Sequence, residues 1–202
     1  MERPDGRDQH VGGSDDGELI RLSLDDPSVF GELFERHATK VQSYLRTRVP
    51  DVVADDLLAQ TFVTAFERRD GFRADASSAL PWLLGIATNL ARGHWRTEAR
   101  RTSLTARLSG RREVSLEGHY EIDAVLARVD SPHTRAVIGE SLARLRPAER
   151  DVLMLSAWEG LKNPEIAEAL GIPVGTVKSR LSRARAAVAT SLSDLTEGTW
   201  NA

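Results

Sequence analysis

Apolar residues recur at steps of three and four along most of the chain, which is the spacing of amphipathic helices. In the N-terminal half this pattern predicts helices over residues 30–50 and 53–68, and a third that begins at Pro81 and continues past Arg96. Pro50 suits the end of the first helix, and Pro81 suits the first turn of the third. Because no segment alternates with a period of two, we expect an all-α fold without a β-sheet.

The C-terminal part of the chain shows the same helical spacing. It predicts one helix before Pro147 and three more over residues 148–158, 163–171 and 173–192. Asn163 followed by Pro164 favours a helix start, and Gly171 favours a helix end.

Two segments lack this periodicity. Residues 1–16 are polar and Gly-rich, which is typical of a disordered tail. Residues 99–133 mix Ser, Gly, Arg and scattered apolar side chains, and we interpret them as a flexible linker. The prediction is therefore two small helical domains, joined by that linker. The parts are a tail at 1–16, a first helical domain at 17–98, the linker at 99–133, a second helical domain at 134–192 and a tail at 193–202.

Composition excludes several classes of protein. The chain has 202 residues and no cysteine, which excludes disulfide scaffolds and thiolate zinc sites and favours a cytoplasmic location. The longest nearly apolar stretch, residues 80–87, is too short to insert into a membrane. The five histidines are scattered, and the sequence contains no P-loop and no Gly-x-Ser-x-Gly. We therefore predict no metal, no cofactor, no catalytic residue and no enzymatic activity.

Charge is distributed unevenly along the chain. Residues 1–30 carry eight acidic and three basic side chains, whereas residues 84–112 carry seven arginines and one glutamate. Between residues 169 and 193 the only charged side chains are one lysine and three arginines. Two basic segments in an acidic chain indicate two contacts with a polyanion, although solvated helix faces would give the same pattern.

The sharpest local pattern is a helix-turn-helix over residues 165–185. Ala167 is small where two helices must approach, Gly171 suits the tight turn, and Val177 is spaced to pack back onto the first helix. Burial of one face of the second helix then leaves a basic outer face, which can bind DNA bases and phosphates. The side chains predicted to contact DNA are Thr176, Lys178, Ser179, Arg180, Ser182, Arg183 and Arg185. An ordinary helical hairpin with a basic exterior is the alternative.

Two blocks of the sequence together resemble bacterial RNA polymerase sigma factors. Asp-Asp-Leu-Leu-Ala-Gln-Thr-Phe from Asp55, Phe72-Arg73, and Pro-Trp-Leu-Leu-Gly-Ile-Ala-Thr-Asn from Pro81 resemble sigma region 2. The segments from Leu145 and from Gly160 resemble region 4. Since only the linker separates the blocks, the layout is similar to that of the extracytoplasmic-function (ECF) group of the sigma-70 family.

The resemblance implies a promoter-specificity subunit with three binding surfaces. The polymerase core would be bound through the clamp of its largest subunit by Asp55, Asp56, Leu57, Gln60 and Thr61. The −10 element would be recognised and melted by Asp75, Ala76, Ser77, Asn89, Arg92, His94, Trp95 and Arg96. In region 4, Lys178, Ser179, Ser182 and Arg183 would read bases of the −35 element, and Thr176, Arg180 and Arg185 would contact its backbone.

The resemblance also implies further partners. Region 4 would rest on the flap of the second-largest polymerase subunit, and an anti-sigma factor would hold the protein inactive. The linker would either enter the polymerase cleft or serve only as a tether.

Some alternatives remain open at this level. Asp55 and Asp56 also suit an ordinary helix N-terminus, and Trp95 suits either a core position or a stacking platform for a base. A free-standing helix-turn-helix regulator would account for the C-terminal block. It would leave the motifs at residues 55–57 and 81–89 unexplained.

Overall fold

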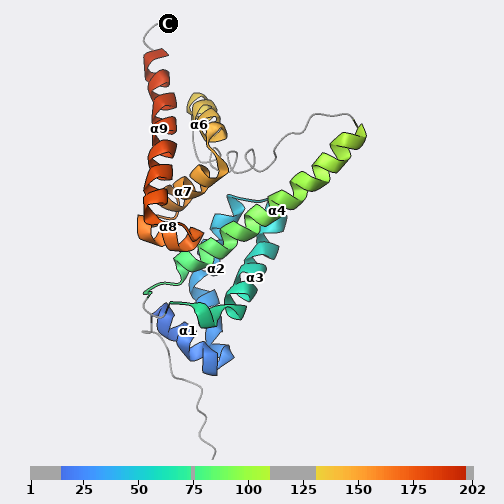
Figure 1. Ribbon diagram of the computed structural model, residues 1–202, viewed down its shortest axis with the longest axis vertical. Coiled ribbons are helices and arrows are strands. Elements are labelled where there is room, and N and C mark those ends of the chain that lie inside the picture. Colours follow the sequence, from blue (N-terminus) through green and yellow to red (C-terminus); the bar gives the residue numbers. More distant parts are fainter. Residues whose placement is uncertain (1–14, 74–75, 110–130, 199–202) are drawn as a thin grey trace, which may run out of the picture.

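The computed structural model describes residues 15–73, 76–109 and 131–198, and over these residues the chain is helical without a β-strand (Figure 1). The α-helices are α1 (Asp16–Asp25), α2 (Gly31–Arg46), α3 (Asp51–Glu67), α4 (Leu80–Ser109), α6 (Pro132–Arg144), α7 (Pro147–Ala157), α8 (Asn163–Leu170) and α9 (Val174–Gly198). Two short 3-10 helices, η1 (Pro27–Phe30) and η2 (Arg69–Gly71), lie in the N-terminal half. The prediction of an all-α fold is confirmed.

Helices α1 to α4 form the N-terminal body. Its core is built from the apolar positions that the helical spacing predicted, among them Leu33, Val41, Leu45 and Leu83, each at most 1% exposed. Burial of each such side chain contributes roughly 1.5–3 kcal/mol relative to leaving it in water. The body is thus held mainly by the faces that α2, α3 and α4 turn toward one another.

Helix α1 was not predicted from the sequence. The predicted tail ended at residue 16, whereas Asp15 caps the N-terminus of α1 by accepting a hydrogen bond from the Glu18 N–H at 2.8 Å. Asp16 is the first residue of the helix and is buried. The remainder of that tail, residues 1–14, lies outside the described residues. The helix was missed because its apolar residues, Leu19, Ile20, Leu22 and Leu24, do not recur on one helix face.

Helix α4 is longer than the predicted domain boundary allowed. The linker was expected to start at residue 99, but α4 continues through Ser109, and α6 starts at Pro132. The predicted linker is therefore helical at both ends, and its middle, residues 110–130, lies outside the described residues. The exposed pair of Glu98 with Arg101 at 2.9 Å, one turn apart, favours this continuation.

Helices α6 to α9 form the C-terminal body. Gly171 ends α8 with a positive φ of 62°, a backbone conformation that glycine adopts without a steric penalty. A small cluster of Leu142, Leu145, Met154 and Ala184 joins α6, α7 and α9. The predicted turn of the helix-turn-helix is thus present.

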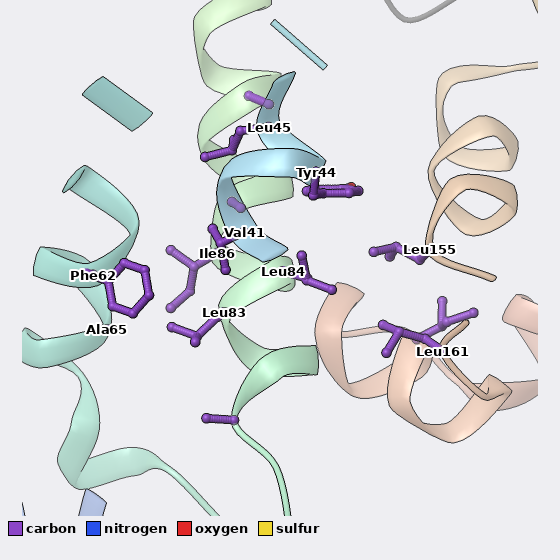
Figure 2. Packing of buried hydrophobic residues seen from close by; sticks show 14 of the residues in the cluster. Val41, Tyr44, Leu45, Phe62, Ala65, Leu83, Leu84, Ile86, Leu155 and Leu161 are labelled. Carbon is purple, nitrogen blue, oxygen red and sulfur yellow. The ribbon is translucent and has the colours of Figure 1, made fainter. Parts of the chain in front are cut away.

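The two bodies pack directly against each other, through α4 and α8 (Figure 1). A Cβ atom built on Gly85 of α4 would lie 2.1 Å from the carbonyl oxygen of Ala169 in α8, so only glycine permits this approach. One continuous core runs across the contact, and Figure 2 shows Leu155 of the C-terminal body on the side facing Tyr44 and Leu84. The sequence predicted a tether between the bodies and gave no sign of this shared core.

None of the helices over residues 15–73, 76–109 and 131–198 combines the length and the hydrophobicity of a membrane-spanning segment.

Candidate nucleic-acid interfaces

The helix-turn-helix consists of α8 and α9. Ile166 and Ala167 of α8 are buried against Val177 and Leu181 of α9. The Ile172 N–H donates to the Ala167 carbonyl at 3.0 Å, which closes the end of α8 in the manner of a Schellman motif. The first helix therefore supports the second, and the outer face of α9 remains open to solvent.

The side chains expected at the −35 element lie on that outer face. Lys178, Ser179, Ser182, Arg183 and Arg185 are exposed, and Thr176 and Arg180 are partly buried. No acidic residue lies between Ala169 and Ser193. The structure thus brings the predicted set together on one basic surface.

Arg183 is held by a partner that the sequence did not reveal. Its Nε donates to Glu149 of α7 at 2.7 Å, and this bond is the main cause that keeps the pKa of Glu149 below its usual value. Arg185 of the same face donates to the Ser156 hydroxyl at 3.4 Å. Helix α7 therefore orients two of the predicted DNA contacts.

The residues expected at the −10 element divide into two groups. Ser77, Asn89 and Arg96 are exposed and Ala76 is partly buried, which leaves them accessible to a DNA strand. Asp75 lies outside the described residues.

The second group is turned into the protein. Trp95 is 7% exposed and donates its indole N–H to the Arg48 carbonyl at 2.9 Å, so the structure favours its core alternative over a stacking platform. His94 packs edge-on against the Trp95 ring, with centroids 5.0 Å apart. The Arg92 guanidinium donates from Nε to Asp151 at 2.9 Å.

Asp151 of α7 is the centre of a buried ion cluster between the two bodies. It is 2% exposed and also accepts from Arg48, which is 1% exposed. Sequence reasoning did not single out Asp151. The available signal was a carboxylate four residues before the core Leu155, on the same helix face.

The expected polymerase-binding residues lie along α3. Asp55, Asp56 and Gln60 are exposed, and Leu57 is partly buried. Thr61 is fully buried and donates its hydroxyl to the Leu57 carbonyl at 2.7 Å, so in this structure it braces α3 and offers no contact to a partner. Its spacing was a signal for burial, because Thr61 lies three residues after Leu58 and four residues before the buried Ala65.

Two exposed valines accompany the acidic residues of α3. Val52 is 83% exposed and Val63 is 54% exposed. With Asp56 and Ala59 they fall at steps of four, three and four, so they share one helix face. This face is partly apolar and has no cover among the described residues, a feature typical of a protein-binding surface.

Asp16 is a second buried carboxylate that the sequence did not single out. Its Oδ2 lies 2.6 Å from His37 Nε2 and accepts the Ala79 N–H at 2.7 Å, and Arg36 lies 3.3 Å from its Oδ1. Burial alone would raise the pKa of Asp16, but the bonds from His37, Ala79 and Arg36 together lower it to about 2. Asp16 is thus ionised and ties three segments of the N-terminal body together.

Comparisons with known proteins agree with the two bodies. A model of sigma-70 region 2 matches residues 33–101, and a model of sigma-70 region 4 matches residues 135–188. The RNA polymerase sigma factor NccH of Alcaligenes xylosoxydans is 31% identical over 168 residues, covering 82% of this chain and 88% of NccH. The ECF RNA polymerase sigma-E factor of Escherichia coli K12 is 29% identical, covering 83% of this chain and 88% of its own length.

Two solved structures share the fold. CnrH, solved in complex with the cytosolic domain of CnrY, aligns with a TM-score of 0.61 at 27% identity, over 89% of this chain and 97% of CnrH. The sigma factor RpoE of Bartonella quintana, solved with the anti-sigma factor NepR, aligns with a TM-score of 0.56 at 19% identity. That alignment covers 81% of this chain and 96% of RpoE.

Proposed function

This chain belongs to the ECF group of the sigma-70 family of RNA polymerase sigma factors, and we propose that its two bodies divide promoter recognition between them. As a sigma factor it is a DNA-binding transcription initiation factor that binds core polymerase and promoter DNA. The observation that carries the proposal is the open basic face of α9 on one body, combined with the accessible side chains of α4 on the other.

The C-terminal body reads the −35 element. Lys178, Ser179, Ser182 and Arg183 are presented in the first part of α9, the part of a recognition helix that enters the major groove. Lysine and arginine there match the acceptors of guanine, and serine can bond either a base or a phosphate. Thr176, Arg180 and Arg185 bind the backbone, which sets the register of the helix on DNA. Region 4 also rests on the flap of the second-largest polymerase subunit.

The N-terminal body recognises the −10 element. Ala76, Ser77 and Asn89 receive an unstacked base, and their polar groups and the surrounding surface offset the few kcal/mol of unstacking. Arg96 extends this surface along α4, and Asp75 completes the proposed set. Arg92 and His94 join it once the contact of Arg92 with Asp151 is released.

The exposed face of α3 binds the clamp of the largest polymerase subunit. Asp55, Asp56 and Gln60 supply its polar contacts, and Val52 and Val63 supply apolar area that would otherwise remain in water. Leu57 contributes its exposed edge. Thr61 supports the helix from within.

The packed arrangement of the two bodies must change on a promoter. Elements named −10 and −35 lie about 25 base pairs apart, or roughly 85 Å at 3.4 Å per pair. Helix α8, which supports the reading helix, is packed on α4 at Gly85. We therefore infer that the contact between α4 and α8 opens when both elements are bound.

The remaining parts of the proposal concern partners and location. The protein acts without an active site of its own, in the cytoplasm, as the specificity subunit of the polymerase. An anti-sigma factor is proposed as its inhibitor. This is supported by the fold shared with the sigma factor RpoE of Bartonella quintana, which was solved with the anti-sigma factor NepR.

The test is reconstitution of initiation. The chain is mixed with core polymerase and a promoter library, and transcripts are mapped. We expect defined start sites, each preceded by shared −35 and −10 sequences. A free-standing regulator would give no initiation with core polymerase alone, and that result would refute the proposal.

Arg183→Ala sharpens the test of the −35 interface. Loss of a base contact should weaken binding to the cognate −35 sequence by about 1–3 kcal/mol and leave binding to random DNA almost unchanged. Arg144→Ala, which removes an exposed arginine of α6, is the matched control. An equal loss on both DNAs would make Arg183 a phosphate contact.

A further inference from the structure

Helix α1 contacts both ends of the segment that joins α3 to α4. At its N-terminal end, Asp16 Oδ2 accepts the Ala79 N–H at 2.7 Å. Toward its C-terminal end, the Ser23 carbonyl accepts from Arg69 Nε at 3.3 Å. Arg69 begins η2, and Ala79 immediately precedes α4. A single helix of ten residues therefore spans the start and the end of the segment that carries Ala76 and Ser77.

The Asp16 contact fixes a backbone position rather than only a side chain. Ala79 accepts the first bond of α4, from the Leu83 N–H at 2.9 Å, so its own N–H points out of the helix and needs an external acceptor. A carboxylate is the strongest such acceptor, and the N-terminus of a helix favours its negative charge. His37 and Arg36 in turn hold the carboxylate in place.

The other end of the segment is anchored by two aromatic contacts. The Arg69 guanidinium lies 3.8 Å above the centre of the Phe66 ring while its Nε reaches Ser23. The Phe72 ring packs on Trp82 of α4 with centroids 4.9 Å apart. The described residues on both sides of the segment, Arg69 and Phe72 before it and Ala79 after it, are therefore anchored.

We propose that α1 acts as a brace for −10 recognition and that Asp16 is its positioning residue. The brace holds Ala76, Ser77 and the N-terminus of α4 in the conformation that receives the unstacked base, so these residues do not have to be ordered on binding. Asp16 touches no DNA and acts through Ala79. The inference rests on the proposed −10 role of this segment, and α1 itself precedes the residues matched by the region 2 model.

The experiment compares holoenzymes that contain the wild-type chain, Asp16→Ala or Asp26→Ala. Asp26 also accepts a backbone N–H, from Ser28 at 3.0 Å, but it lies at the far end of α1 and touches neither loop anchor. Three affinities are measured: for core polymerase, for a duplex with the −35 element only, and for single-stranded oligonucleotides with the cognate or an altered −10 base.

We expect Asp16→Ala to lower the preference for the cognate −10 base about tenfold, because a charge-assisted bond that orders the segment is lost. The affinities for core polymerase and for the −35 duplex should remain within about twofold, and Asp26→Ala should resemble wild type. Asp16→Asn keeps an acceptor oxygen without the charge, so it should give an intermediate loss. It also replaces Asp16→Ala if that variant does not fold.

Two results would overturn the inference. The first is a parallel loss of all three affinities in Asp16→Ala, which would make Asp16 a folding residue only. The second is an unchanged −10 preference in the Asp16 variants. Asn89→Ala separates this failure from a failure of the proposed function. If Asn89→Ala abolishes the −10 preference and the Asp16 variants do not, only the brace is wrong. If Asn89→Ala is also without effect, the proposed −10 site, of which Asn89, Ala76 and Ser77 are parts, is wrong as well.

Discussion

Asp16 and Asp151 are both buried carboxylates, 5% and 2% exposed, yet they join different parts of the molecule. Asp16 binds His37, Arg36 and the Ala79 backbone, all within the N-terminal body. Asp151 belongs to α7 of the C-terminal body and binds two arginines of the N-terminal body. The first carboxylate stabilises a body, whereas the second stabilises the contact between bodies.

This difference decides when each interaction is present. The Asp16 contacts persist as long as the N-terminal body is folded. The Asp151 contacts vanish when the bodies separate, and the three charges are then rehydrated, which offsets much of the Coulomb energy that is lost. A buried ion cluster is therefore compatible with a contact that opens. Removal of one member costs more free energy than separation of the bodies, because it leaves a partner charge buried, whereas separation returns all three charges to water.

Asp151→Ala should destabilise the packed arrangement of the two bodies more than any other single substitution. It leaves the Arg48 guanidinium buried without this carboxylate, which should destabilise the packed state by about 3–5 kcal/mol. The bodies should separate in response, because separation returns Arg48 to water. Urea unfolding and small-angle scattering measure the two effects, and we expect an earlier first transition and a larger radius of gyration.

Glu140→Ala is the control for Asp151→Ala. It removes an exposed carboxylate that pairs with Arg144 one turn away, an interaction of about 0.2–0.5 kcal/mol. Equal radii of gyration for Asp151→Ala and wild type would show that the ion cluster does not hold the bodies together.

Ionisation of Asp16 should make the unfolding free energy depend on pH in the acidic range. Its pKa is about 2 in the folded protein, below the ordinary 3.8, so folding favours the ionised form. The resulting stability, about 2 kcal/mol, is fully present above about pH 4 and is lost as the pH falls through 2. Asp16→Asn cannot titrate at this position. The difference in unfolding free energy between wild type and variant should therefore shrink between pH 5 and pH 2.

The measurement is urea unfolding at a series of pH values. A difference between wild type and Asp16→Asn that stays constant down to pH 2 would show that the native contacts do not hold Asp16 ionised.

Gly85→Ala tests the contact between the bodies without a change of charge. The new Cβ would meet the Ala169 carbonyl oxygen at 2.1 Å, so α4 and α8 must move apart. Overpacking costs about 1–3 kcal/mol, and the better helix propensity of alanine returns up to about 1 kcal/mol. We expect a net loss of about 1 kcal/mol in thermal unfolding.

Gly93→Ala is the matched control in the same helix. Its Cβ would meet only the end of the Arg96 side chain, at 4.0 Å, so it should raise stability by about 0.5–1 kcal/mol. Opposite signs for the two substitutions support a close contact at Gly85, and the same sign would contradict it.

The helix-turn-helix shows which structural features a local sequence pattern can predict. Its turn at Gly171, the packing of Val177 and the open basic face were all expected, because each depends on the spacing of residues within about 20 positions of one another. The expectation of an all-α fold rests on the same local periodicity. The resemblance to sigma regions 2 and 4 is confirmed by the comparisons, whereas the roles of the individual site residues remain predictions.

The helical periods, the turn of the DNA-binding motif and the family follow from the amino-acid sequence. Only the packing of distant segments shows that Trp95 turns inward, that α1 contacts the start of α4, and that Asp151 joins the two bodies. The two sets of features differ in the range of the interactions that produce them. A hydrophobic period depends on residues that are close together in the sequence. The role of a buried polar side chain depends instead on the partner that it contacts. The partners of Asp16 and Asp151 lie between 20 and 103 residues away along the chain.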